Sequence, residues 1–324
     1  RNASLVSWSS SSALSRPATN LNRPLPTSIP NSENTGDAMS ETKAFTTQDI
    51  TFCIKTIHRP WSCQRLVESL RRHFENPKII VVDDGRPDLR FSAKYPESAR
   101  HCRVVDLDQH DVGVGVGRNI AIDAAETEFI FLLDDDHVIT EDVHLDLAYH
   151  RFHKHDIDIL GVRQGGGGRP LLFAPLMNGR RIWMFRGEHR RIGPLAWCDM
   201  SSNAFLARRD TIAKLRWDPA IKTYEHWEFF YRASHLEDLK VAVAEDCMVV
   251  HAHYPLGETR VERQAMALLE RDIAVDVICL RTSAEPAQSM VNGVQVYRLP
   301  VRRHKGYGLV MQLFEYLAFF VLAS

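Results

Sequence analysis

The chain has 324 residues, of which 44% are hydrophobic and 25% are charged, a composition typical of a globular protein with one large or two modest domains. Its 40 basic and 41 acidic residues leave a formal net charge of −1, so no basic field indicates a nucleic-acid partner. The six cysteines are scattered without a CxxC pair, which indicates reduced, buried thiols rather than a disulfide framework or a zinc site.

Residues 1–48 differ in composition from the rest of the chain. The first 32 residues carry three arginines, no acid and many Ser, Asn, Thr and Pro residues, so they cannot bury enough apolar surface to become ordered. We therefore expect 1–48 to be a disordered or leader segment. An organelle transit segment, a linker and translation upstream of a natural start at Met39 all fit this composition.

From Asp49 onward, apolar runs and amphipathic stretches alternate along the chain. These patterns predict, in order, a strand at 50–56, a helix at 62–74, strands at 78–82 and 101–107, a helix at 117–126 and a strand at 129–133. The pattern continues with a helix at 141–155, a strand at 157–163, a turn at 164–170, a strand at 199–207, helices at 211–215 and 225–234, and strands at 240–244 and 248–251. Such alternation predicts a mostly parallel sheet flanked by helices, with ligands bound beyond the carboxyl ends of the strands.

Three aspartates, Asp134, Asp135 and Asp136, follow the apolar strand at 129–133. Like charges this close repel one another and shift each other's pKa values, so an apolar strand that ends this way usually needs a counter-ion. A hard divalent cation takes oxygen ligands and keeps its remaining positions for water and substrate phosphates. The triplet therefore predicts a metal that holds a diphosphate, and a solvated acidic loop or helix N-cap is the alternative.

Further polar groups are expected at the same edge of the sheet. Asp83 and Asp84 follow the second predicted strand, where a carboxylate can accept hydrogen bonds from a ribose hydroxyl or a base N–H. The end of the first predicted strand and the loop after it add Thr56 and Arg59. An ordinary Asp-Gly turn is the alternative for the two aspartates. The convergence of the three groups on one edge is what indicates a ligand site.

Glycines alternate in the stretch before the predicted helix at 117–126. The spacing of Gly113, Gly115 and Gly117 is GxGxG rather than GxGxxG, and no apolar strand immediately precedes it, so the dinucleotide fingerprint of a dehydrogenase is not indicated. We expect instead a compact loop that enters a helix, with Arg118 directed at a phosphate or at an aspartate of the triplet.

Acids and histidines recur later in the chain. Glu225 and Glu228 are spaced i, i+3 among aromatic residues, which puts them on one helix face, and a Glu in an apolar pocket has the raised pKa of a general base. A helix with core aromatics and solvated acids fits the pattern as well. His251 and His253 occupy alternate positions after an apolar strand, so both imidazoles can face one ion.

Residues 49–255 resemble glycosyltransferases of the GT-A fold, of the family-2-like type, and within that set the β-1,4-N-acetylgalactosaminyltransferase group. The segments that carry the resemblance are Ile54-Lys55-Thr56 with Arg59, Val82-Asp83-Asp84, Gly117-Arg118-Asn119, Leu133-Asp134-Asp135-Asp136, Asp199 to Leu206 with Asn203, His226-Trp227-Glu228-Phe229-Phe230, and His251. The resemblance implies an α/β fold with a Rossmann-like mixed sheet. It also implies inverting transfer of a sugar, such as an N-acetylhexosamine, from a nucleotide-diphosphate donor to a glycan, lipid or other hydroxyl acceptor.

The resemblance also implies roles for individual residues. The donor, a UDP-sugar, is expected on Thr56, Arg59, Asp83, Asp84, Arg118, Asn119, Asp134 and Asp135. The metal, Mn²⁺ or Mg²⁺, is expected on Asp136, Asp134 and His251, where it neutralises the leaving diphosphate. Glu228 is expected to deprotonate the acceptor hydroxyl, and Asp199 to contact the donor sugar or the acceptor. This chain has Val250 where the family motif has an Asp before the histidine.

The tail, 256–324, resembles a different type, the amino-terminal domain of family-4-type GT-B glycosyltransferases. The stretches 259–264, 275–281 and 293–300 carry this resemblance. It implies a truncated α/β half-domain, from a longer fusion or a gene-model join, that is catalytically silent by itself.

No uninterrupted run of about 20 apolar residues occurs, so a conventional membrane span is not predicted. The largely apolar stretch 309–324 follows a basic cluster at 302–305, which fits peripheral contact with an anionic membrane through 302–324. A core-facing helix of a truncated domain fits equally. The expected location is cytoplasmic or peripheral at the membrane, or an organelle or Golgi-type compartment if 1–48 is genuine.

Two competing functions stay open at this stage. A nucleotidyltransferase also places carboxylates and a metal at strand ends, although it usually has a Gly-rich basic loop after its first strand. A non-catalytic module that binds a nucleotide sugar would keep the fold without needing Glu228 or Asp136. No oligomeric state is predicted.

Overall fold

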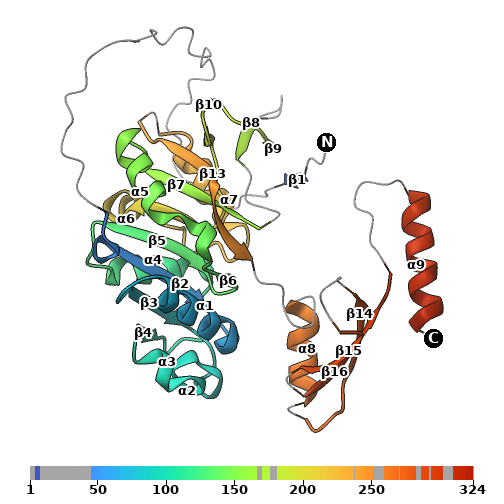
Figure 1. The fold of residues 1–324 in the computed structure, drawn as a ribbon. Coiled ribbons are helices and arrows are strands. Elements are labelled where there is room, and N and C mark those ends of the chain that lie inside the picture. Colours follow the sequence, from blue (N-terminus) through green and yellow to red (C-terminus); the bar gives the residue numbers. More distant parts are fainter. Residues whose placement is uncertain are drawn as a thin grey trace. The chain divides into compact units, whose positions relative to one another are not determined.

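The computed structural model describes residues 4–7, 45–165, 170–175, 181–236, 238–251, 259–269, 271–281, 286–291, 293–301 and 309–323 (Figure 1). The chain divides into two compact units, Arg1–His251 and Ala252–Ser324, and each is described by itself.

A ten-stranded mixed sheet forms the centre of the first unit (Figure 1). Parallel pairs are formed among β2 (Ile50–Thr56), β3 (Lys78–Asp83), β4 (Arg103–Asp106), β5 (Phe129–Asp134), β7 (Ile159–Gln164) and β13 (Val241–His251). The remaining strands are β6 (His137–Val138), β10 (Arg190–Ile192), β11 (Leu195–Trp197) and β12 (Phe205–Arg208). β12 lies between β5 and β7 and pairs antiparallel with both. The sheet is therefore parallel on either side of β12, as the alternation predicted, but β12 itself runs in the opposite direction.

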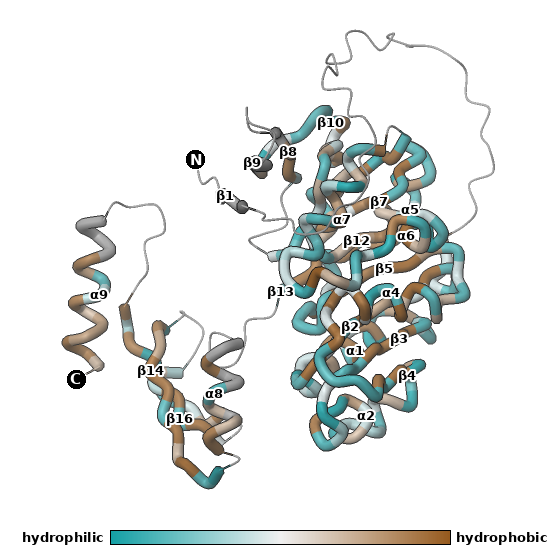
Figure 2. The backbone as a smooth tube through the Cα atoms, turned by 180° about the vertical axis from the view of Figure 1, so that it is seen from behind, coloured by the Kyte–Doolittle hydropathy of each residue, from teal (hydrophilic) through white to brown (hydrophobic). Residues whose placement is uncertain are grey.

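Helices cover both faces of this sheet. One face carries α1 (Pro60–His73) and α5 (Leu145–Lys154), and the other carries α4 (Val114–Ala124), α6 (Arg209–Leu215) and α7 (Glu225–Ala233). The short helices α2 (Phe91–Lys94) and α3 (Pro96–Ala99) lie between β3 and β4 in the chain. Neighbouring residues of β2 pack on opposite faces: Phe52 packs in the core on the side of α1 and α5, and Cys53 packs in the core on the side of α4, α6 and α7. Burial on both faces explains why the central strands, brown in Figure 2, are continuous apolar runs.

The helix expected at 117–126 begins earlier, at Val114, and two predicted strand regions also differ from the observed ones. The strand expected at 199–207 forms only in its last part, as β12, while Met200 makes an isolated bridge to Leu171 outside any strand. The last two strands expected in this unit are one strand, β13, whose pairing is irregular between Ala244 and Met248. That irregularity coincides with the interruption of the apolar pattern from which two strands were predicted.

A separate antiparallel sheet joins β8 (Leu171–Pro175), β9 (Arg181–Arg186) and β1 (Ser4–Ser7). β1 belongs to the segment expected to be a disordered or leader sequence, of which 1–3 and 8–44 lie outside the described residues. All six cysteines are free; four of them are buried, and Cys102 and Cys279 are partly exposed.

The second unit contains α8 (Thr259–Leu269), β14 (Asp276–Leu280), β15 (Gln288–Val291), β16 (Val294–Leu299) and α9 (Leu309–Ala323). β16 pairs in parallel with β14 and antiparallel with β15, and a small core forms around Val277, Val294 and Val296. Its likeness to a GT-B half-domain stays a prediction. So does membrane contact through 302–324, of which 302–308 lies outside the described residues. Among the helices described, none has the length and apolar character needed to cross a bilayer.

Candidate functional site

The carboxyl ends of neighbouring strands meet at one edge of the ten-stranded sheet. The last residue of β2, Thr56, lies opposite Asp83 of β3, and the adjacent strand β5 ends at Asp134. On β13, His251 lies opposite His137 of β6. The register therefore brings the polar ends of these strands to a single edge, as ligand sites of α/β sheets require.

Asp134 is held by two side chains. Arg118 Nη2 donates to its Oδ1 at 2.8 Å, and Asn203 Nδ2 donates to its Oδ2 at 2.9 Å. Arg118 also pairs with Glu225 Oε1 at 3.2 Å, and its guanidinium lies over the Trp217 ring. Burial is the largest single influence and raises the pKa of Asp134, but the charge of Arg118, the effect of His137 and the hydrogen bond from Arg118 together hold the pKa below its usual value. Asp134 is thus an anion in a fixed orientation.

Asp135 binds the loop that follows β2. Thr56 Oγ1 donates to its Oδ2 at 2.6 Å, and Arg59 Nη2 lies 2.5 Å from its Oδ1. Its backbone carbonyl accepts the hydroxyl of Ser62 at 3.0 Å. Burial raises the pKa of Asp135 to about 7, and the charge of Asp136 adds to this while Arg59 opposes it. Asp135 therefore anchors the loop with Thr56 and Arg59 at the strand end.

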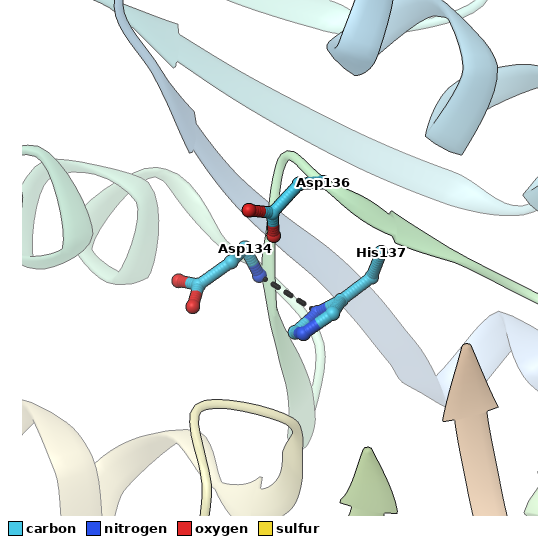
Figure 3. A group of neighbouring side chains, drawn as sticks. All are labelled: Asp134, Asp136 and His137. Atoms are coloured by element: carbon cyan, nitrogen blue, oxygen red, sulfur yellow. Dashed lines mark hydrogen bonds between the residues drawn. The ribbon is translucent and has the colours of Figure 1, made fainter. Parts of the chain in front are cut away.

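Asp134, Asp136 and His137 form a group whose ligand atoms lie within 4.8 Å of one another (Figure 3). Asp136 Oδ2 also lies 3.4 Å from His251 Nε2 and 3.4 Å from Arg59 Nη1. The hydrogen bond to Asp136 raises the pKa of His251. Two ligands about 2.1 Å from one ion lie roughly 3 Å apart, so Asp136 and His251 fit a shared divalent cation.

His137 fits a metal ligand less well than His251 does. The backbone N–H of Asp134 donates to His137 Nδ1 at 3.1 Å, so that nitrogen carries no proton (Figure 3). The proton of the neutral ring then sits on Nε2, which is buried and has no partner in the described part of the chain. An ion on Nε2 would force the proton onto Nδ1, against the N–H of Asp134. His137 therefore orients the turn between Asp134 and Asp136.

A buried ion pair joins Lys55 to Asp84 next to the glycine loop. Lys55 Nζ also donates to the Thr56 carbonyl at 2.7 Å, and Asp84 Oδ2 accepts the N–H of Val112 at 2.8 Å. A Cβ on Gly117 would overlap the Lys55 side chain. The glycine at this position therefore reflects close packing of α4 against β2. Because α4 begins at Val114, Gly115 and Gly117 lie inside the helix and not in the compact loop expected from the sequence.

Asp83 is turned toward its own loop. Its two oxygens accept the backbone N–H groups of Gly85 and Phe91, each at 2.8 Å. Burial is the largest influence and raises the pKa of Asp83. Together with Asp84, it organises the loops at this edge, a structural duty beside the donor contact expected from the sequence.

Asn119, another expected donor contact, has both amide atoms on the backbone of Trp217. Its Nδ2 donates to the Trp217 carbonyl at 2.8 Å, and its Oδ1 accepts the Trp217 N–H at 3.0 Å. This reciprocal pair ties α4 to the segment before α7. The contacts give Asn119 a structural role, and its expected contact with the donor stays a prediction.

The contacts of Asp199 and Glu228, the two expected catalytic residues, lie elsewhere. Asp199 accepts the N–H of Phe173 at 2.8 Å and pairs with His189 Nε2 at 2.7 Å. Both oxygens of Glu228 bind Arg232, one turn further along α7. These contacts do not join either residue to the aspartates of β5.

Glu225 is the acid of α7 that reaches the aspartates, through Arg118. The i, i+3 spacing made both Glu225 and Glu228 candidates. Because Arg118 lies 107 residues from Glu225 in the chain, the sequence did not indicate which of the two acids pairs with Arg118. Asn203, which binds Asp134, belongs to a segment that carries the family resemblance, but no role at the site was expected of it.

The mixed sheet with carboxylates and a histidine at one edge defines the GT-A class of α/β fold. The model of the family described as glycosyl transferase family 2 matches residues 51–216, just over half of the chain, and the chain therefore belongs to that family.

Two curated relatives are β-1,4 N-acetylgalactosaminyltransferases. The chain is 25% identical over 188 residues to type 2 of Mus musculus, an alignment that covers 56% of this chain and 35% of the relative. It is 28% identical over 216 residues to type 1 of Homo sapiens, covering 63% of this chain and 39% of the relative. The chain thus spans little more than a third of the length of these relatives.

A solved structure of GalNAc-T7 with UDP, GalNAc and Mn²⁺ has a similar fold. The TM-score is 0.50 at 16% sequence identity, over 65% of this chain and 44% of that one. This likeness bears on the fold, which agrees with the GT-A class.

Proposed function

We propose that this protein transfers an N-acetylhexosamine from a UDP-sugar to a hydroxyl acceptor on a glycan or lipid. The observation that carries the proposal is the aspartate run at the end of β5, in which Asp136 faces His251 at 3.4 Å. Membership of glycosyl transferase family 2 supports the reaction class. The names of the curated relatives support the choice of an N-acetylhexosamine.

Asp136, His251 and Asp134 would hold Mn²⁺ or Mg²⁺. Their oxygen and imidazole donors suit such an ion, and Asp136 and His251 are spaced as two ligands of one centre. When bound, the ion supplies Lewis-acid stabilisation of the charge on the leaving diphosphate.

Side chains around the aspartates would position the donor. Asp134, kept anionic by Arg118, would accept hydrogen bonds from ribose or sugar hydroxyls. Arg59, which lies between Asp135 and Asp136, offers a cation to the diphosphate. Thr56, Asp83 and Asp84 would shape the nucleoside site through the loops that they hold.

The general base would come from the first turn of α7. We favour Glu225 over Glu228, because Glu225 is connected to Asp134 through Arg118, whereas both oxygens of Glu228 bind Arg232. A base in this place would accept the proton of the acceptor hydroxyl as that oxygen attacks the anomeric carbon.

The test is release of UDP from UDP-GlcNAc and UDP-GalNAc with and without Mn²⁺. We expect Mn²⁺-dependent release that falls at least about 100-fold in Asp136→Asn. Asp142→Asn, an exposed acid in the following turn, is the matched control and should keep the activity. Metal-independent donor binding without turnover, or pyrophosphate formation from UTP and a sugar 1-phosphate, would contradict the proposal.

A further inference from the structure

A cavity of about 500 Å³ lies at the other end of β13 from His251. It is lined by His155, His189, Arg190, Ile192, Trp197, Cys198, Asp199, Ser234, Leu236, Leu239, Lys240 and Val241. Val241 begins β13 and His251 ends it, so about 30 Å of extended strand separates the cavity wall from the metal-ligand candidates. The cavity is therefore distinct from the aspartate site, and its volume falls within the range of small-molecule pockets.

Arg190 is the distinctive charge of this cavity. Its guanidinium lies over the Trp197 ring, 5.6 Å from the ring centroid. Within the residues that the structure describes, no carboxylate pairs with it. A guanidinium held over an aromatic face keeps its planar N–H fork available for a bidentate oxyanion.

The other charged side chains of the wall already have partners. Lys240 Nζ lies 2.6 Å from Asp156 Oδ2. Asp199 uses one oxygen for the Phe173 N–H and the other for His189 Nε2. Arg190 is therefore the charge in the wall that is left for a ligand.

His155 reports the electrostatic character of this wall. Its ring packs edge-on against Trp197 at a centroid distance of 5.7 Å. Burial lowers the pKa of His155, and the positive charges of Lys154, Arg190 and Arg151 lower it further. Positive potential that disfavours a proton on this imidazole favours an anion in the adjoining space.

We propose that this cavity binds a sugar-sized ligand that carries an oxyanion, either a carboxylate or a phosphate. Arg190 takes the oxyanion, and the apolar wall formed by Trp197, Leu236 and Leu239 receives the ligand's apolar face. Leu236 is 50% exposed, which is consistent with a side chain that a ligand would cover. The cavity shares no residue with the metal, donor and base positions proposed above, and the Asp199 in its wall is the residue that the sequence had placed at the donor sugar or the acceptor.

The test measures binding of glucuronate, glucose 6-phosphate and glucose to the full chain by calorimetry, with tryptophan fluorescence as a second readout. We expect glucuronate, glucose 6-phosphate or both to bind and glucose to bind at least tenfold more weakly. Binding of glucuronate alone assigns a carboxylate, and binding of glucose 6-phosphate alone assigns a phosphate. Equal binding of glucose, or no binding of either anion, would overturn the proposal.

Matched variants locate the binding. Arg190→Gln should weaken it at least tenfold, Arg190→Lys should retain part of it, and Arg186→Gln, an exposed arginine outside the lining, should leave it unchanged. Asp136→Asn should also leave it unchanged, which separates this site from a failure of the transferase proposal. If Arg190→Gln folds and binds as tightly as the parent, the anion is bound elsewhere and the proposal is wrong. If Arg190→Gln does not fold, binding by Arg190→Lys that is as tight as in the parent would show the same.

Discussion

Arg118 Nη2 lies 2.8 Å from Asp134 Oδ1, and the side chain of Arg118 is 2% exposed. A second nitrogen of the same guanidinium lies 3.2 Å from Glu225 Oε1. One buried cation thus joins the strand that carries the aspartates to the helix that carries the candidate base. It reduces the repulsion between the two carboxylates and fixes where each of them points.

Removing the positive charge of Arg118 should lower the stability of the protein, apart from any effect on the reaction. Arg118→Met leaves the partly buried Asp134 and Glu225 without their shared partner, so we expect a loss of up to about 3–5 kcal/mol in the free energy of unfolding. Urea unfolding at pH 7 measures it. Arg118→Lys, which keeps the charge but not the fork, should lose less. A loss below about 1 kcal/mol for Arg118→Met would show that the bridge is not formed.

The two acids of α7 should separate in activity. Glu225→Gln keeps the size of the side chain but cannot accept a proton, so kcat for sugar transfer should fall about 100- to 10,000-fold. Glu228→Gln should mainly weaken the contact with Arg232 and retain most of kcat. Steady-state kinetics of both variants at a saturating acceptor concentration test this. The reverse ranking would return the base role to Glu228, as the sequence first indicated.

Gly117 should not accept a side chain. Because a Cβ would overlap Lys55, Gly117→Ala should displace the ion pair with Asp84 and cost about 1–3 kcal/mol of stability. Gly165→Ala is the control, since its Cβ meets nothing closer than 3.9 Å, and it should change stability by less than about 0.5 kcal/mol. Thermal unfolding of the two variants side by side gives the comparison. Equal melting temperatures would argue against the packing of α4 on Lys55.

His226 should make the protein less stable in acid. Burial lowers the pKa of His226 to about 3, and its Nε2–H donates to the Ser201 carbonyl at 3.0 Å. An unfolded histidine titrates near pH 6.5, so between about pH 6.5 and 3 unfolding takes up a proton on this ring. The contribution of His226 to the free energy of unfolding is therefore fully present above about pH 6.5. It is lost as the pH falls, by up to about 1.4 kcal/mol per pH unit.

The matched variant for this effect is His226→Gln, which retains an N–H for Ser201 and does not titrate. Urea unfolding at pH 7, 6 and 5 should show a shallower decline for the variant than for the parent. Parallel declines would mean that His226 is solvated in the folded protein.

Much of the central sheet could be predicted from local pattern. The strand expected at 50–56 coincides with β2, and the strand expected at 129–133 forms β5 with one further residue, Asp134. Both are buried on two faces, so their apolar runs were long and clear. The placement of β12 between β5 and β7 could not be predicted, because which strands pair depends on contacts between distant parts of the chain.

The candidate site, like the sheet, could be predicted from the sequence only in part. The sequence by itself determined that Asp134, Asp135 and Asp136 end a buried strand, because strand periodicity and charge are local properties. Only the tertiary structure decided that Asp136 faces His251, that Asp135 holds Arg59, and that Arg118 selects Glu225. Each of these choices joins residues far apart in the chain, and ion pairs at such separations are set by how helices dock on the sheet rather than by spacing along the sequence.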